Sequence, residues 1–226
     1  MPLNQKIQEN FRLKYRLEFH NCCHKAVIKG HQSMLKNSSD FKQWKEEKIS
    51  ARLLHEMKNL DLLKSNQIIV DREHHLEDKD VLFGDKEASE EDRIDFIFLS
   101  SWFQKKYLEY FGEAKNISLN NWKKAIGSKV NASSYRKRYI ETGINNLVFG
   151  KYSKLEGFLI AYVVNGTAKE NRASLNEFIK EKNLLPKTGL LENALPICSY
   201  PSCYFSKNIT VGKVVVLQHI FLEYDN

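Results

Sequence analysis

The hydropathy of residues 93–99 alternates from one residue to the next, and this alternation constrains the fold more than any other feature of the chain. One face of the segment carries the apolar residues Ile94, Phe96 and Phe98. Asp95 lies on the opposite face with Arg93, Ile97 and Leu99. A period of two residues predicts a β-strand, because successive side chains of a strand point to opposite faces of a sheet.

A second strand is predicted at residues 110–115, which end in Glu113-Ala114-Lys115. Glu113 and Lys115 are two residues apart and therefore point to the same side of a strand. If the two strands are neighbours, Asp95 joins them in one small patch. Two carboxylates in one place suit Mg²⁺, which binds oxygen ligands. A nearby lysine could orient an attacking water or neutralise charge that develops on a phosphate. The connection at residues 100–106 is longer than a tight hairpin, so the pairing is an inference.

This arrangement resembles the PD-(D/E)XK nuclease superfamily, which includes many restriction endonucleases. Its signature is an aspartate on one strand and Glu-x-Lys or Asp-x-Lys on the next, here Asp95 and Glu113-Ala114-Lys115. The resemblance implies that Asp95, Glu113 and the Ala114 carbonyl bind Mg²⁺ or Mn²⁺, and that Lys115 positions the attacking water. The ordinary alternative is a surface aspartate and an unrelated Glu/Lys pair. Gly112 departs from the pattern, because an apolar strand residue is more usual there.

A helix is predicted from Ser39 or Asp40 to about Lys64, with an apolar stripe and a capping residue at its start. Within it, residues 47–54 resemble the first core helix of the nuclease family, in which a glutamate often points toward the metal. Glu47 is the candidate for this role, with Glu46 and Glu56 as competitors. Three solvated helix glutamates are the alternative.

The remaining pattern predicts an α/β fold. Helices are expected at residues 4–19, about 133–149 (capped by Ser133 or Ser134) and 169–182, and strands at residues 67–72, 157–164, 203–209 and 213–223. Residues 73–92 are acidic and predict a loop, and residues 184–201 are loop-rich. The order over residues 42–164 is that of the restriction-endonuclease-like αβββαβ core, with a mixed central sheet flanked by helices. We expect an N-terminal helical extension at residues 1–40 and a nuclease-like domain at residues 41–226, with the C-terminal strands extending the sheet.

The charge of the chain is distributed unevenly. The formal net charge is +7, from 35 basic and 28 acidic residues. Residues 71–95 carry eleven acidic and four basic side chains, whereas residues 115–154 carry nine basic side chains and one acidic. This asymmetry suits a polyanion-binding face beside an acidic metal site; the alternative is an uneven solvated surface. The candidates for nucleic-acid binding are Lys123, Lys124, Lys129, Arg136, Lys137 and Arg138.

Composition and cysteine usage predict a cytoplasmic protein without a membrane segment. No apolar run approaches the length needed to span a bilayer, and residues 1–16 lack the apolar region of a signal peptide. A dense cluster of cysteine and histidine raises the alternative of a zinc site, but without the usual ligand spacing. Buried reduced thiols are the favoured interpretation. The residues concerned are His20, Cys22, Cys23, His24 and His31, with Cys198 and Cys203 as further candidates.

The sequence therefore predicts a metal-dependent nuclease that hydrolyses phosphodiester bonds, with DNA as the expected substrate and RNA left open. Residues 139–144 and 149–152 look like the corresponding helix of bacterial nuclease-like proteins linked to phage defence, which implies a role in antiviral defence or restriction. A homodimer or a subunit of a defence complex would fit. The alternative is a catalytically silent nucleic-acid-binding or assembly subunit on the same fold, or a nuclease that needs a partner protein.

Overall fold

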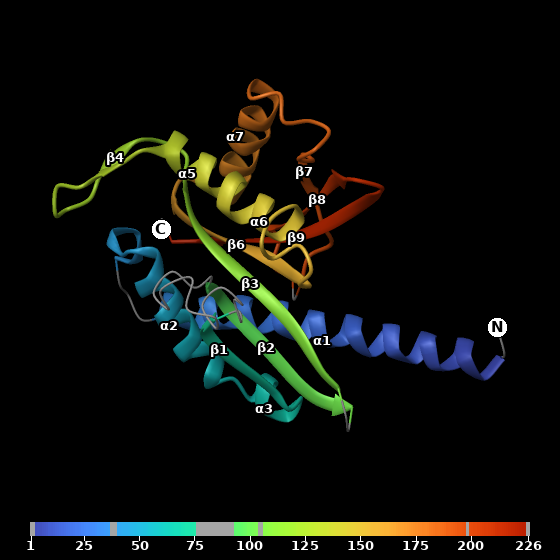
Figure 1. Cartoon of the computed structure of the whole chain (residues 1–226). Coiled ribbons are helices and arrows are strands. Elements are labelled where there is room, and N and C mark those ends of the chain that lie inside the picture. The colour runs from blue at the N-terminus through green and yellow to red at the C-terminus, as the bar shows by residue number, and fades with distance from the viewer. Residues whose placement is uncertain (1–2, 37–39, 76–92, 104–105, 198, 225–226) are drawn as a thin grey trace, which may run out of the picture.

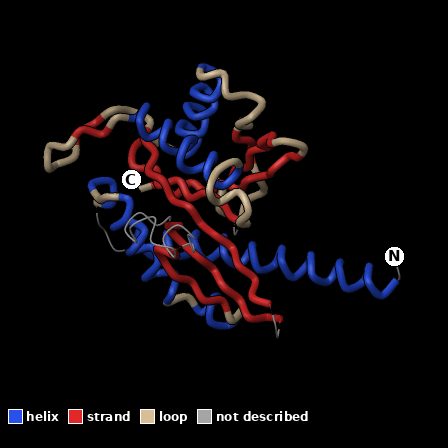
Figure 2. The backbone as a smooth tube through the Cα atoms, in the orientation of Figure 1, coloured by secondary structure: helices blue, strands red, loops and turns tan. Residues whose placement is uncertain are grey.

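The structure is a computed structural model that describes residues 3–36, 40–75, 93–103, 106–197 and 199–224. Within these residues, seven strands form one mixed sheet in the order β1-β2-β3-β6-β9-β8-β7 (Figures 1 and 2). The strands are β1 (Ile68–His75), β2 (Arg93–Phe103), β3 (Lys106–Ser118), β6 (Gly157–Asn165), β7 (Leu191–Asn193), β8 (Cys203–Thr210) and β9 (Lys213–Glu223).

The directions of the strands make the sheet mixed. The first three strands are antiparallel to one another, β6 runs parallel to both β3 and β9, and β8 and β7 complete the sheet with antiparallel pairs. The strand predicted at residues 157–164 is central and buried on both faces, as its unbroken apolar run indicated. The other predicted strands are confirmed as well, and the C-terminal pair extends the sheet.

Helices cover both faces of the sheet and enclose two apolar cores (Figure 1). The first face is covered by α1 (Leu3–Lys36), η1 (Phe41–Gln43), α2 (Glu46–Lys58) and α3 (Asp61–Ser65). The second face is covered by the π-helical turn η3 (Tyr139–Ile144), α6 (Asn145–Val148) and α7 (Ala168–Glu181), whereas Tyr135 of the preceding α5 (Ala132–Arg138) packs against the first core. The coarse prediction of an α/β fold, with a mixed sheet between helices, is confirmed.

The first helix is longer than predicted. It was expected to end at residue 19, but α1 continues to Lys36 through the cysteine- and histidine-rich segment. The segment contains many polar residues, but one face of the helix is buried. Phe19 before the segment and Val27 and Ile28 within it are fully buried in the core. Gly30 lies where α1 packs on α2, and a Cβ atom there would be 2.9 Å from Met57 Cγ.

Two other helix boundaries differ from the prediction. The helix expected at residues 40–64 consists of η1, α2 and α3, because Trp44 and Lys45 are extended and Asn59 ends α2. The helix expected from residue 133 begins one residue earlier, and Asn131 caps it by accepting a hydrogen bond from the Ser134 N–H.

The connection between β2 and β3 is shorter than expected, because β2 extends to Phe103 and β3 begins at Lys106. The acidic loop expected at residues 73–92 lies outside the described residues, except that residues 73–75 belong to β1. Within the predicted loop at residues 184–201, three residues form β7.

Gly112 has a packing role inside β3. It pairs with Phe96 on one side and with Phe158 on the other. A Cβ atom at this position would lie 3.3 Å from the Phe158 ring and 3.4 Å from Phe96 Cβ. The absence of a side chain at Gly112 therefore leaves space for the side chains of Phe96 and Phe158 beside Glu113.

A two-stranded ribbon, β4 (Trp122–Lys123) and β5 (Lys129–Val130), follows β3 and extends away from the main sheet (Figure 1). We call residues 122–130 the hairpin arm. None of the helices in the described part of the chain combines the length and the apolar character that a membrane crossing requires.

Candidate active site

The candidate site lies where β2 and β3 part. The register of this pair ends at Phe96 opposite Gly112, whereas β3 remains paired with β6 as far as Ser118. Beyond Gly112 the backbone N–H groups on the β2 side of β3 donate to carboxylates. Ala114 N donates to Asp95 Oδ2 at 2.7 Å, and Asn116 N donates to Glu46 Oε2 at 2.8 Å. The carboxylates take the place of strand partners, because buried N–H groups require acceptors.

Lys115 stands at the centre of these groups. Its Nζ lies 2.5 Å from Glu113 Oε1 and 2.9 Å from the Ala114 carbonyl oxygen. The same nitrogen lies 3.7 Å from Glu46 Oε1 and 3.9 Å from Asp95 Oδ2. We call Glu46, Asp95, Glu113 and Lys115 the carboxylate–lysine cluster. The three residues of the sequence motif are brought together as predicted.

The structure brings Glu46, and not Glu47, to the cluster. The Glu47 side chain is exposed, and its backbone oxygen accepts a hydrogen bond from Arg72. Glu56 accepts a hydrogen bond from Ser33 of α1 and pairs with Arg52, one turn earlier on α2. Successive helical side chains are rotated by about 100°. The register of α2 follows from the buried Ile49 and Leu53, and the extended Trp44 and Lys45 before it were not evident in the sequence.

Burial raises the pKa of Glu113 to about 7, and the neighbouring charge of Asp95 acts in the same direction. The Glu113 side chain is only 7% exposed, and its second oxygen, Oε2, is buried without a hydrogen-bond partner. An unsatisfied buried carboxylate oxygen is costly. Glu113 therefore holds a proton more readily than an ordinary glutamate and has an open acceptor.

Asp95 and Lys115 respond to the same surroundings. Burial raises the pKa of Asp95, although Lys115 and the Ala114 N–H oppose this change. Burial acts to lower the pKa of Lys115, but attraction to Glu113, Asp95 and Glu46 outweighs it, and the pKa is raised. Lys115 is thus held as a buried cation among carboxylates.

The donor set of the cluster suits a hard divalent cation. Carboxylate oxygens of Asp95 and Glu113 and the Ala114 carbonyl oxygen are the kinds of ligand that Mg²⁺ and Mn²⁺ prefer. In the structure the Lys115 ammonium occupies the space among these oxygens and supplies the positive charge. Within the described residues, no three His, Cys, Asp or Glu side chains form a group that could hold a metal ion as they stand. The oxygens could hold one after Lys115 Nζ moves away from Glu113.

A π-helical turn supports the cluster, and no local pattern in the sequence indicated it. Gly143 in η3 lies against the aliphatic part of the Lys115 side chain. A Cβ atom added at Gly143 would be 3.7 Å from Lys115 Cγ and 3.1 Å from Leu159 Cδ2. π-Helical turns are rare and frequently occur at functional sites. The turn thus limits where the lysine stem can lie.

The predicted basic residues have different surroundings. Lys124 Nζ donates to the backbone oxygens of Gln43 and Trp44, at 3.1 and 2.8 Å, and Arg136 donates to those of Ser118, the last residue of β3, and Leu119. Lys124 and Arg136 therefore tie backbone segments together. Lys137 is exposed and lies 3.8 Å from Glu141.

The other three basic residues are also exposed. Arg138 lies 3.4 Å from Glu46 Oε1, so it borders the carboxylates directly. Lys123 and Lys129 are exposed on the hairpin arm, directly opposite one another in its register. The sequence identified all six residues by their charge. It could not show that Lys124 and Arg136 bind backbone oxygens while the other four side chains are exposed.

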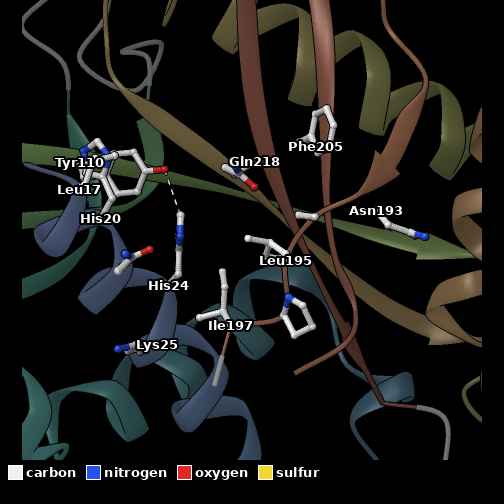
Figure 3. A pocket seen from close by; sticks show the side chains of 13 residues that line it. Leu17, His20, His24, Lys25, Tyr110, Asn193, Leu195, Ile197, Phe205 and Gln218 are labelled. Atoms are coloured by element: carbon white, nitrogen blue, oxygen red, sulfur yellow. Dashed lines mark hydrogen bonds between the residues drawn. The ribbon is translucent and has the colours of Figure 1, made fainter. Parts of the chain in front are cut away.

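The cysteine- and histidine-rich segment forms part of the core and of a cavity of about 650 Å³ (Figure 3). His24 Nε2 lies 3.0 Å from the Tyr110 hydroxyl, and His31 donates to the Glu223 carbonyl oxygen. His20 stacks on the Tyr110 ring. Cys23 and Cys203 are buried and Cys22 is half-buried, and none of these three forms a disulfide within the described residues; Cys198 lies outside them. Among described residues these side chains form no metal-binding group, and the interpretation as reduced thiols stays a prediction.

Comparisons with known proteins return no match: no protein-family model, no curated protein and no solved structure is significantly similar to this chain.

Proposed function

We propose that this protein is a metal-dependent nuclease that hydrolyses phosphodiester bonds in DNA. The observation that carries the proposal is the carboxylate–lysine cluster at the fork between β2 and β3. The carboxylates of Asp95 and Glu113 both lie close to Lys115 Nζ there, and Glu113 Oε2 is buried without a hydrogen-bond partner. A buried and a half-buried carboxylate with raised pKa values beside a buried lysine are typical of functional sites.

The sheet supports a finer proposal, that residues 46–165 form a restriction-endonuclease-like αβββαβ core. A helix precedes three antiparallel strands, and a helical crossover then leads to a strand parallel to the third. This is the order that the family resemblance implied. Fold alone does not fix function, so the cluster remains the main support.

Each member of the cluster has a distinct proposed role. A divalent cation held by Asp95, Glu113 and the Ala114 carbonyl would supply positive charge for the phosphate oxygens. Lys115, released from Glu113, would donate hydrogen bonds to the attacking water and to a phosphate oxygen. Glu46 would keep the edge of β3 in place through its hydrogen bond to Asn116 N. Arg138, exposed beside Glu46, would contact the phosphate next to the bond that is cut.

A second candidate is a catalytically silent nucleic-acid-binding subunit, or a nuclease that acts only with a partner. The observation that favours it is the position of Lys115 Nζ, which closes the space among the carboxylates at 2.5 Å from Glu113. A lysine that never leaves this position would neutralise the carboxylates permanently and keep a divalent ion out.

The decisive experiment compares the wild type with Lys115→Ala. Cleavage of supercoiled plasmid and of single-stranded DNA is followed with Mg²⁺ or Mn²⁺, and Mn²⁺ binding is measured by calorimetry on the same preparations. We expect the wild type to cut and Lys115→Ala to cut at least 100-fold more slowly. We also expect Lys115→Ala to bind Mn²⁺ more tightly, because a competing buried cation is gone.

Lys169→Ala provides the matched control, because Lys169 is an exposed lysine on α7. It should cut and bind Mn²⁺ as the wild type does. Equal cleavage by wild type and Lys115→Ala would contradict the assignment of the site. Absence of cleavage by the wild type, together with absence of Mn²⁺ binding, would favour the silent subunit.

A further inference from the structure

The hairpin arm is held by hydrogen bonds to the segment that precedes α2. Lys124 Nζ donates to the backbone oxygens of Gln43 and Trp44, and Ala125 N donates to Gln43 Oε1 at 2.8 Å. Within the arm, Lys124 N donates to the Ser128 carbonyl oxygen and Gly127 N to that of Lys124. Side-chain and backbone hydrogen bonds thus fix the arm to the segment that leads into α2.

That segment also carries a member of the carboxylate–lysine cluster. Trp44, which accepts from Lys124, is two residues before Glu46, whose carboxylate binds the edge of β3. The arm itself begins four residues after β3 ends at Ser118. The arm is therefore connected to the cluster in two ways, along the chain from β3 and through its hydrogen bonds to the segment that leads to Glu46.

The two faces of the arm differ in character. Val130 is buried and its partner Trp122 is half-buried against the core, which ties one face to the body. The next pair, Lys123 and Lys129, is exposed and cross-strand. Like charges directly opposite one another destabilise a ribbon. Lys45 adds a third exposed positive charge beside the arm, near enough to contribute to a lowered pKa of Lys124, for which burial is the main cause.

The tip of the arm is apolar and projects into solvent. Ile126 is 84% exposed, and Gly127 follows it with a φ of 85°, a value that glycine adopts without strain. A Cβ atom on Gly127 would meet no atom within 4 Å. The arm therefore combines a narrow, protruding shape with paired exposed lysines and an apolar tip.

We propose that the hairpin arm enters the major groove of double-stranded B-form DNA, with Lys123, Lys129 and Lys45 on the flanking phosphates. This inference rests on the proposed function and names its substrate as a duplex. The major groove of B-DNA is wide enough for a two-stranded ribbon, and its thymine methyl groups offer apolar contacts for Ile126. The major groove of A-form RNA is too narrow and deep for such an element. A single strand offers no groove, so the protruding ribbon favours duplex DNA over both.

The test measures binding and not cleavage. Fluorescence anisotropy in EDTA follows a labelled 20-base-pair DNA duplex, an RNA duplex of the same sequence and the single DNA strand, over a range of salt concentrations. We expect the DNA duplex to bind most tightly. The double variant Lys123→Ser/Lys129→Ser should bind it at least tenfold more weakly at 0.1 M salt. The slope of log K against log salt should become shallower by about 1.8, because each of the two phosphate contacts releases about 0.9 counterions.

The matched control is Lys169→Ser/Lys180→Ser, which removes the same charge from exposed positions on α7. Equal weakening by both double variants would overturn the proposal, because the effect would then be one of net charge. Equal or tighter binding of the RNA duplex or of the single strand would also overturn it.

A second measurement tests the groove. Methylation of guanine N7, which lies in the major groove, should weaken binding of the wild type, and an excess of a minor-groove drug should not. The opposite pattern would overturn the placement of the arm. Failure of the proposed function would give a different result. If the protein binds duplex DNA through the arm in EDTA but never cuts it with Mg²⁺ or Mn²⁺, the nuclease assignment is wrong and the role of the arm still holds.

Discussion

Glu113 has the most informative environment of any single side chain. It is surrounded by apolar strands and by like charge, which together raise its pKa to about 7. Its Oε1 contacts Lys115, while Oε2 has no hydrogen-bond partner. A proton and the Lys115 ammonium therefore compete for one carboxylate, and under the proposed function a metal ion would compete with both, with a balance that depends on pH.

We expect Mn²⁺ affinity to depend on the protonation of Glu113. A raised pKa means that the folded protein holds the proton below about pH 7, so a metal must displace it. Affinity should fall by up to tenfold per pH unit below pH 7 and level off above it. Calorimetry between pH 5.5 and about 8 measures this dependence.

The variant Glu113→Gln should lose Mn²⁺ binding at every pH, because it cannot become charged. The control Glu141→Gln changes an exposed carboxylate paired with Lys137 and should keep the wild-type profile. Mn²⁺ affinity that is independent of pH from 5.5 to about 8 would contradict the assignment of Glu113 as the titrating ligand.

At the scale of elements, the contact between α1 and α2 places the site. Glu46 reaches Lys115 because α2 packs on the sheet, and α1 packs beside α2 on the same face of the sheet. Gly30 allows the close approach of these two helices. The position of a cluster member thus depends on a glycine that is remote from it in the chain.

Gly30→Ala should destabilise the protein, although alanine is the better helix former by about 1 kcal/mol. The added Cβ would lie 2.9 Å from Met57 Cγ and 3.1 Å from Leu53 Cδ1, so the helices must separate or the side chains must move. Overpacking of this kind costs about 1–3 kcal/mol, and we expect a net loss of about 1 kcal/mol. Urea unfolding followed by circular dichroism measures it. Lys29→Ala, on the exposed side of the same helix, should be nearly neutral, and a stabilised Gly30→Ala would show that the interface yields freely.

At the scale of the whole molecule, three histidines among the described residues are buried: His24, His31 and His219. Burial lowers the pKa of His24 and of His219 to about 3, and that of His31 to about 4. His219 bridges Tyr139 and Ser206, and His31 donates to the Glu223 carbonyl oxygen. These neutral rings connect α1, the helical crossover and the last two strands. Protonation of the rings therefore lowers the free energy of unfolding of the whole protein.

We expect the free energy of unfolding to fall as the pH is lowered from about 6.5 to about 5. A lowered histidine pKa gives stability that is complete above the unfolded value and is lost below it. In this range the unfolded chain binds protons on these three histidines, whereas the folded chain keeps the three rings neutral and already holds a proton on Glu113, whose pKa is raised to about 7. The net dependence is therefore at most two protons, or about 3 kcal/mol per pH unit, and the raised pKa of Asp95 reduces it further.

Urea unfolding at a series of pH values measures this slope. His31→Gln retains a donor for the Glu223 carbonyl oxygen but does not titrate, so its slope should be smaller by about one proton. His55→Gln, at an exposed position, should leave the slope unchanged. A stability that does not vary between about pH 6.5 and 5 would contradict the neutral state of the buried histidines.

The sequence by itself determined the elements whose signals are local. Alternation in residues 93–99 and the apolar run in residues 157–164 predicted strands, because side-chain period and burial on both faces leave a direct mark on hydropathy. The same local spacing predicted that Glu113 and Lys115 share a side, and the order of elements predicted a mixed sheet between helices. These predictions needed no knowledge of distant contacts.

Only the tertiary structure decided which distant groups complete the cluster. Glu46 and Glu47 are equivalent in sequence, and the packing of α2 on the sheet turned the first toward Lys115. Lys124 and Lys123 are equally basic, but the contact with Gln43 and Trp44 makes one a structural tie and leaves the other exposed. Helix register and side-chain partners depend on contacts between segments far apart in the chain, and local patterns carry no record of them.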